Sequence, residues 1–222
     1  MKYETFSNNP EFLDPEYEVE QGVTLEHFGI KEQIEVSEIN EASDAIYGNP
    51  ETDAKNWHHQ TESVSCAVAC QEFIVEQLTG QEYYEHDLIQ YAENLGWYDP
   101  ESGTSIKDVG NILEAAGLLV ERGEQYTLND LAEELESGGK VICGVNNKIL
   151  QNPMYSLVPG LRANHAVQVS GIDASDPNNV EVILNDPGVI NGRGLRVPAD
   201  TFMKAWGTGD NFAVFARKGV TV

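Results

Sequence analysis

The chain has 222 residues and carries 37 Asp and Glu against 13 Lys and Arg, which gives a formal net charge of -24 at pH 7. Nucleic acids and anionic membrane surfaces are bound through Lys and Arg, so this charge argues against both and favours solubility or a basic partner. A solvated acidic surface that serves no partner also fits this charge. A chain of this length buries a core either as one large domain or as one domain with an appendage.

The sequence contains no stretch close to the roughly 20 continuous apolar residues that a membrane span needs. Its first residues also lack the apolar core of a secretory signal. We therefore expect a cytoplasmic protein, or one that is exported without a Sec signal peptide. The three cysteines, Cys66, Cys70 and Cys143, are an odd and sparse set, so we expect reduced thiols rather than a disulfide framework.

The first quarter of the chain is its most acidic part. Residues 1–55 hold 14 Asp and Glu and three Lys. We interpret 1–55 as an N-terminal extension of a domain that spans 56–222. The extension is either a partly disordered acidic arm or a segment that packs on the domain and covers its cleft as a latch. A latch predicts that a chain starting near Asn56 reacts faster than the full chain.

The first half of the domain has helical periodicity. Apolar residues recur at helical spacing from Cys66 to Leu78, and Gly80 is placed to end this first helix. Further helices are predicted over 84–95, 106–116 and 127–136. The last of these begins with a Thr and an Asp three residues later, which is the spacing of a capping box.

The second half changes to the two-residue period of strands. Strands are predicted over 140–146, 165–172, 180–185 and 212–216, with a short helix over 201–206. Helices followed by antiparallel strands define an α+β domain, in which the first helix packs on a C-terminal antiparallel sheet.

Cys66 stands at the beginning of the first predicted helix. Ser63 and Ser65 precede it as N-cap candidates, and the free N–H groups and dipole of a helix N-terminus favour a thiolate. Gln60 is placed to bring its side-chain amide to the same helix end, so that the amide and the Cys66 backbone N–H both point at a developing oxyanion. On its own, a cysteine on an apolar helix face also fits an inert core residue.

A nucleophilic thiolate needs a base, and the base needs a partner that fixes its tautomer. His165 and Asp186 are candidates for these roles because the turn over 174–179 separates their strands symmetrically. A symmetric hairpin sets the two residues opposite each other, with Cβ atoms about 4.5–5.5 Å apart, and a bulge of one residue would break this register. Taken singly, His165 fits a core histidine and Asp186-Pro187-Gly188 fits a turn.

The residues around the helix start allow a second interpretation as a zinc site. His58, His59, Cys66 and Cys70 are close in sequence, but their spacing does not match a common structural site and zinc would occupy the nucleophile. We therefore predict neither a metal nor an organic cofactor. Cys70, one helical turn after Cys66, is expected to be a core residue.

These motifs, in this order, resemble papain-like cysteine peptidases. The resemblance covers roughly 57–216 and is carried by the Gln-x5-Cys spacing with a helix behind it and by the runs 164–172 and 185–188. The nearest group is the bacteriocin-processing (double-glycine leader) peptidases and their stand-alone bacterial relatives. The resemblance implies Gln60 in the oxyanion hole, Cys66 as nucleophile, His165 as general base and acid, and Asp186 as the residue that orients His165.

The chain departs from the transporter-linked peptidases at the nucleophile, where Ser65-Cys66-Ala67 replaces the usual Asp-Cys-Gly, and it has no Walker-type run. We predict a cysteine peptidase that hydrolyses a peptide or isopeptide bond through an acyl-enzyme, with a peptide or protein substrate of basic character. Transglutaminase-like acyl transfer or glutamine deamidation would use the same triad. A catalytically silent domain that binds a peptide is the third alternative, and the oligomeric state is left open.

Overall fold

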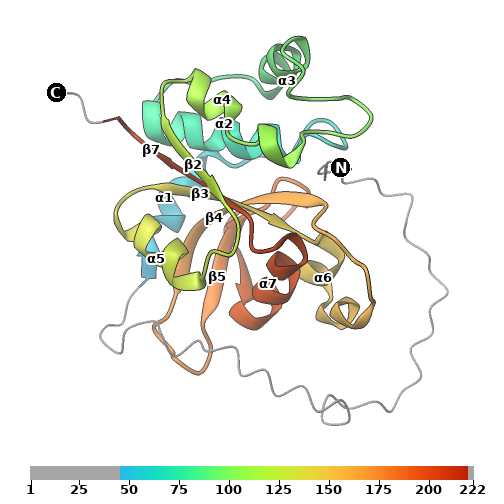
Figure 1. Cartoon of the computed structure of the whole chain (residues 1–222). Coiled ribbons are helices and arrows are strands. Elements are labelled where there is room, and N and C mark those ends of the chain that lie inside the picture. Colours follow the sequence, from blue (N-terminus) through green and yellow to red (C-terminus); the bar gives the residue numbers. More distant parts are fainter. Residues whose placement is uncertain (1–45, 220–222) are drawn as a thin grey trace.

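The computed structural model describes residues 46–219, which form a seven-stranded antiparallel sheet with helices packed on both faces (Figure 1). The strands are β1 (Ile46–Gly48), β2 (Leu119–Gly123), β3 (Lys140–Val145), β4 (His165–Asp173), β5 (Glu181–Asn185), β6 (Leu195–Pro198) and β7 (Ala213–Arg217). The helices are α1 (Pro50–Asp53), α2 (Cys66–Thr79), α3 (Glu85–Asn94), α4 (Asn111–Ala115), α5 (Leu128–Glu136), α6 (Asn147–Gln151) and α7 (Ala199–Trp206). The order of the strands across the sheet is β2-β7-β3-β4-β5-β6, and β1 pairs with the end of β4.

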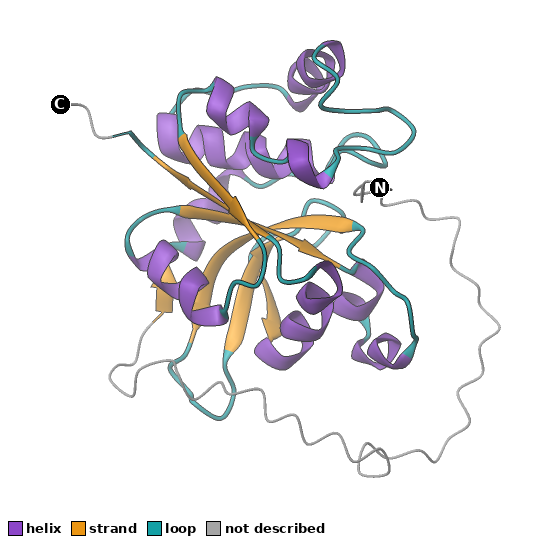
Figure 2. Ribbon diagram, in the orientation of Figure 1, coloured by secondary structure: helices purple, strands orange, loops and turns teal. Residues whose placement is uncertain are grey.

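Alternate residues of the central strands point to two separate cores. Helices α2, α3 and α4 cover one face of the sheet, and α5, α6 and α7 cover the other (Figure 2). On β3, for example, Ile142 belongs to the first core, whereas Val141 and Cys143 belong to the second. This is the two-residue period of a strand buried on both faces. The predicted α+β fold, with the Cys66 helix packed on an antiparallel sheet, is confirmed.

Helix α2 has the predicted limits, and its C-terminal end is defined locally. It begins at Cys66 and ends at Thr79, and Gly80 follows with φ of 73° and its N–H bonded to Glu76 O. A glycine adopts this left-handed conformation without the steric cost that a Cβ brings. Phe73 and Ile74 of α2 are fully buried, and each contributes about 1.5–3 kcal/mol by leaving water.

The helix predicted over 106–116 is wrong, because Gly110 interrupts it. The chain forms a short 3-10 helix (Ile106–Asp108) and then α4, separated by Gly110 with φ of 101°. A Cβ at Gly110 would lie 2.8 Å from the Arg122 side chain. The buried Gln71 side chain of α2 stabilises the break, since its Oε1 accepts from the N–H groups of Gly110 and Ile112 at 2.8 and 3.1 Å.

Residues 46–55, the end of the predicted N-terminal extension, contribute to the sheet. β1 pairs with β4, and α1 brings Asp53 into the interior, where both carboxylate oxygens accept from Lys140 Nζ at 2.6 Å. Residues 1–45, which carry most of the predicted acidic arm or latch, lie outside the described residues. None of the helices within 46–219 is long and apolar enough to cross a membrane.

Candidate active site

The four residues assigned to catalysis stand at the ends of elements or in the loops beside them. Cys66 is the first residue of α2 and His165 the first residue of β4, while Asp186 directly follows the last residue of β5. Gln60 lies in the loop that leads into α2. The two loops are joined, because the Gln60 N–H donates to Pro187 O at 2.9 Å.

His165 and Asp186 meet, although not by the direct pairing that a symmetric hairpin predicts. The observed register pairs Gln168 with Asn185 and has a bulge between Val169 and Gly171. Continuing this register would place Asp186 opposite Val167 rather than His165. His165 and Val167 are two residues apart and share a face of the strand, so the two side chains are diagonal neighbours within reach of each other. The predicted register is therefore wrong by two residues, which leaves both side chains on the same face.

The His165–Asp186 contact is short and fully enclosed. Nε2 of His165 lies 2.6 Å from Asp186 Oδ1, and the two side chains are 1% and 4% exposed. Burial alone would lower the pKa of His165, but the Asp186 carboxylate and, after it, the Cys66 side chain outweigh burial and raise that pKa above the ordinary 6.5. Burial would likewise raise the pKa of Asp186, but His165 and the Gly188 N–H lower it. The pair therefore favours an imidazolium beside a carboxylate.

Asp186 is held by three groups besides His165. Its Oδ1 accepts from the Gly188 N–H at 2.8 Å, and its backbone N–H donates to Gly192 O at 2.9 Å. Its carbonyl oxygen accepts from Trp57 Nε1 at 2.8 Å. Trp57 precedes Gln60 by three residues, so the loop before α2 helps to hold the backbone of Asp186 in place. The sequence offers Trp57 as a residue that packs in the core or shields the His165–Asp186 pair, but it does not predict this hydrogen bond to a backbone atom 129 residues away.

Cys66 differs from the other two cysteines in its neighbours rather than in its exposure. All three cysteines are fully buried. Cys66 lies next to the His165 ring and contributes to the raised pKa of that ring. Cys70 donates its thiol to Ala166 O at 3.5 Å, and burial raises its pKa, as it also does for Cys143. Cys70 is a core residue, as predicted.

Gln60, in the loop before α2, has part of its amide unused. Its Nε2 donates to Glu62 O at 2.7 Å, and its Oε1 is buried without a hydrogen-bond partner in the described part of the chain. Ser65 does not cap α2 with its side chain, because its hydroxyl bonds to the backbone of Glu62 instead. The first N–H groups of α2 consequently receive no cap from the preceding serine.

The structure does not support a zinc site made of His58, His59, Cys66 and Cys70. Among residues 46–219, these four side chains do not form a cluster of potential ligands. His58 instead contacts two glutamates, Glu72 and Glu85.

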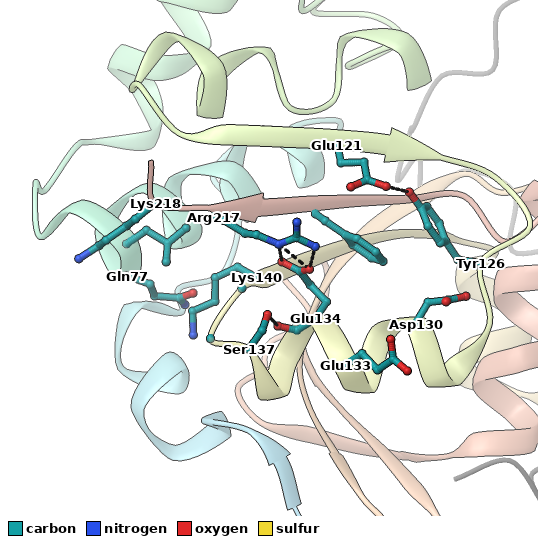
Figure 3. Close-up of a pocket in the computed structure, with 14 residues that line it drawn as sticks. Gln77, Glu121, Tyr126, Asp130, Glu133, Glu134, Ser137, Lys140, Arg217 and Lys218 are labelled. Carbon is teal, nitrogen blue, oxygen red and sulfur yellow. Dashed lines mark hydrogen bonds and ion pairs between the residues drawn. The ribbon is translucent and has the colours of Figure 1, made fainter. Parts of the chain in front are cut away.

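The groove in Figure 3 lies at the other end of the sheet from His165. It encloses about 940 Å³ and is lined by α5, β2, β7 and the C-terminal end of α2. Gln77 of α2 lines it and is about 16 Å from Cys66 along the helix, at a rise of about 1.5 Å per residue. One ion pair joins two of its lining residues, the Arg217 guanidinium and Glu134. None of the four assigned residues lines this groove.

The fold of the chain and the family profile that its sequence matches indicate the same class of protein. The fold is that of the papain-like cysteine peptidases, and residues 49–195 match the family profile described as papain-like cysteine protease AvrRpt2. The match spans more than half of the chain, so the chain belongs to this family. The resemblance inferred from the motif order is thereby confirmed at the level of the family.

The individual proteins that resemble the chain share 28% or less of its sequence. Uncharacterized proteins of Mycobacterium tuberculosis and Mycobacterium bovis are 28% identical to the chain over 204 residues, covering 79% of this chain and 86% of theirs. A putative C39-like peptidase from Bacillus anthracis has the same fold, with a TM-score of 0.58 and 14% identity over 80% of this chain and 100% of that one. A double-glycine motif protease from a transporter, solved with a leader peptide, has a TM-score of 0.48 and 14% identity over 73% of this chain and 91% of that one.

Proposed function

We propose that the protein is a cysteine peptidase that hydrolyses a peptide or isopeptide bond with Cys66, His165, Asp186 and Gln60. One observation carries the proposal. Within residues 46–219, four buried side-chain N or O atoms have no hydrogen-bond partner, and His165 Nδ1 and Gln60 Oε1 are two of them. Folded proteins seldom leave such atoms unpaired outside functional sites. The free Nδ1 belongs to the ring that Cys66 adjoins and Asp186 orients.

His165 is suited to hold and return the proton of Cys66. Because Asp186 occupies Nε2, the proton exchanged with Cys66 resides on Nδ1. The Cys66 thiolate attacks the carbonyl carbon of the substrate, and His165 gives its Nδ1 proton to the departing amine. The resulting thioester is attacked by water, which loses a proton to Nδ1, and the acid product leaves as the thiolate reforms.

The tetrahedral intermediates need donors for their negatively charged oxygen. The Cys66 N–H is one of the four at the start of α2 that have no acceptor inside the helix. Gln60 supplies the second donor, because its Nε2 carries two hydrogens and Glu62 O accepts only one. Donors fixed in this way stabilise charge as it develops, without reorganisation.

A basic peptide or protein is the substrate that we propose. The net charge of -24 attracts cationic chains over distances of about 8–10 Å at physiological salt. The double-glycine protease named above was solved with a leader peptide, which supports a peptide as the class of ligand. The same charge disfavours nucleic acid.

Hydrolysis in water enriched in heavy oxygen tests this proposal. The full chain is incubated with a mixture of basic, glutamine-containing peptides and a primary amine, and the products are sequenced by mass spectrometry. The peptidase predicts new termini with heavy oxygen in the new carboxylate, and none with Cys66→Ala.

The same experiment separates the alternatives. An amine adduct on glutamine without chain cleavage would identify a transglutaminase-like enzyme, and heavy oxygen in a side-chain carboxylate would identify a deamidase. Unmodified peptides that nevertheless bind the chain would indicate a catalytically silent domain and contradict the proposal.

A further inference from the structure

Beside the loop that carries Gln60, three side chains from three different segments converge. His58 comes from that loop, Glu72 from α2 and Glu85 from the first residue of α3. His58 Nε2 lies 3.1 Å from Glu72 Oε2, and His58 Nδ1 lies 3.7 Å from Glu85 Oε2. One donor atom from each residue falls within 4.8 Å of the others. Donor atoms bound to one cation by bonds of about 2.0–2.2 Å are about 3.0–3.6 Å apart. Because the two glutamates contact different ring nitrogens of His58, one of them must rotate to share a cation with the other and with one ring nitrogen.

The two carboxylates are buried in a way that peptidase chemistry does not explain. The Glu72 and Glu85 side chains are 5% and 2% exposed. Oε2 of Glu85 accepts from the Thr61 N–H at 2.8 Å, but Oε1 is buried with no hydrogen-bond partner in the described residues. A buried carboxylate oxygen without a partner is costly unless it binds a cation. His58, at 38% exposed, leaves a route from solvent to the cluster.

The charges of the cluster do not balance by themselves. Two ionised carboxylates carry two negative charges, and one imidazole supplies at most one positive charge. A divalent cation with a neutral imidazole ligand cancels the charge of both glutamates. One nitrogen and two carboxylate donors are the ligand set of a first-row divalent metal rather than of Ca²⁺ or Mg²⁺, which take oxygen ligands.

We propose that His58, Glu72 and Glu85 bind one first-row divalent cation. The ion fastens the loop 57–61 to α2 and α3, since each of the three segments contributes one ligand. Glu85 already holds this loop through the Thr61 N–H, which follows Gln60 directly. The site is separate from Cys66 and His165 and does not depend on peptidase activity.

Titration of the full chain with Mn²⁺ tests the site. Mn²⁺ is the probe because it prefers oxygen and nitrogen ligands, so it avoids the Cys66 thiol that Zn²⁺ would bind. Free Mn²⁺ is counted by electron paramagnetic resonance at about 0.15 M salt, where long-range attraction to an acidic chain is screened. The variants are Glu85→Gln and His58→Gln. Glu76→Gln is the matched control, because it removes the same charge from α2 one turn after Glu72.

The proposal predicts one saturable Mn²⁺ per wild-type chain, and the same in Glu76→Gln. Loss of one ligand should weaken binding at least about tenfold in Glu85→Gln and His58→Gln. Saturating Mn²⁺ should also raise the thermal midpoint of the wild type and Glu76→Gln only, since a ligand of the folded state stabilises that state. Equal binding by all four proteins, or weak uptake that never saturates, would overturn the site. Because Glu85→Gln keeps the shape of the side chain, a folding defect in His58→Gln leaves the test intact.

Discussion

The two ends of α2 each lie near a buried ion pair, and the pairs differ in what they leave unused. At the C-terminal end, Gln77 donates to Asp53 O, and Lys140 Nζ donates to both carboxylate oxygens of Asp53. At the N-terminal end, His165 uses Nε2 for Asp186 and has a free Nδ1 beside Cys66. Burial and distance are nearly the same in both pairs, so neither quantity marks a catalytic site. In the proposed mechanism, the feature that distinguishes the catalytic pair is the unused nitrogen of His165.

The largest expected effect comes from His165→Ala. The variant removes the group that takes and returns the Cys66 proton, so hydrolysis should fall by about 10²–10⁴-fold, the usual contribution of a general acid–base group. The rate is measured on a peptide cleaved in the heavy-oxygen experiment. His86→Ala, which removes an exposed histidine of α3, should keep the wild-type rate. Retained activity in His165→Ala would contradict the assignment of the proton exchange to His165.

Gln60→Ala should lower kcat by about 10²–10³-fold and change KM little, because an oxyanion donor acts mainly in the transition state. Gln90→Ala on the exposed face of α3 is the control. Equal losses in kcat and in substrate affinity would place Gln60 in substrate binding instead of the oxyanion hole.

Asp53→Asn should affect stability and leave chemistry unchanged. The substitution leaves the Lys140 ammonium buried without its counter-charge, which costs about 3–5 kcal/mol of unfolding free energy. Urea denaturation measures this loss. Below the unfolding transition, the rate of Cys66 alkylation should stay within about twofold of wild type, a difference of about 0.4 kcal/mol. A large fall in the rate would show that the C-terminal pair also serves the reactive site.

The pH dependence of Asp186→Asn follows from the shifted pKa values. The raised pKa of His165 stabilises the folded chain fully below about pH 6.5, and this contribution is lost as the pH rises through the raised value. The lowered pKa of Asp186 contributes above about pH 4 and is lost as the pH falls through the lowered value. Asp186→Asn should therefore destabilise most near pH 5.5. At about pH 9.5 the destabilisation should be smaller by at least about 1.4 kcal/mol, the free energy of one pKa unit. Equal urea midpoint shifts at both pH values would contradict the coupling.

The smallest effect concerns residues 1–45. We propose that they act as a latch over Cys66 and His165. A chain that begins at Ile46 keeps β1 and the Asp53–Lys140 pair, which a start near Asn56 would remove. Its Cys66 should react a few-fold faster with iodoacetamide than the full chain, and equal rates would exclude the latch.

Long periodic segments were predictable from the sequence, and short segments defined by their partners were not. The limits of α2 follow from its apolar spacing and Gly80, and α5 has the capping box expected at Thr127 and Asp130. Strands β1 and β6 have three and four residues and form by pairing with β4 and β5, so they lack a period of their own.

The candidate site was predictable in composition but not in geometry. The order of Gln60, Cys66, His165 and Asp186 pointed to the four residues. The bulge near Ser170 and the two-residue change in register depend on how β4 pairs with β5, which no local pattern records. The sequence predicts that Glu72 lies in the first helix, but no local pattern predicts its contact with His58.

The central claim is that the free nitrogen of His165 makes Cys66 a nucleophile. Alkylation of the native chain with a small excess of iodoacetamide, at several values between about pH 5 and pH 8, tests it directly, because an ordinary thiol ionises only near about pH 8.5. Peptide mapping reports all three cysteines, of which Cys70 and Cys143 are internal controls with raised pKa values. We predict that Cys66 alone is modified well below pH 8 and that His165→Ala abolishes this reactivity. If Cys66 is as inert as Cys70 and Cys143, or reacts equally without His165, the His165–Asp186 pair is structural and the proposed mechanism is wrong.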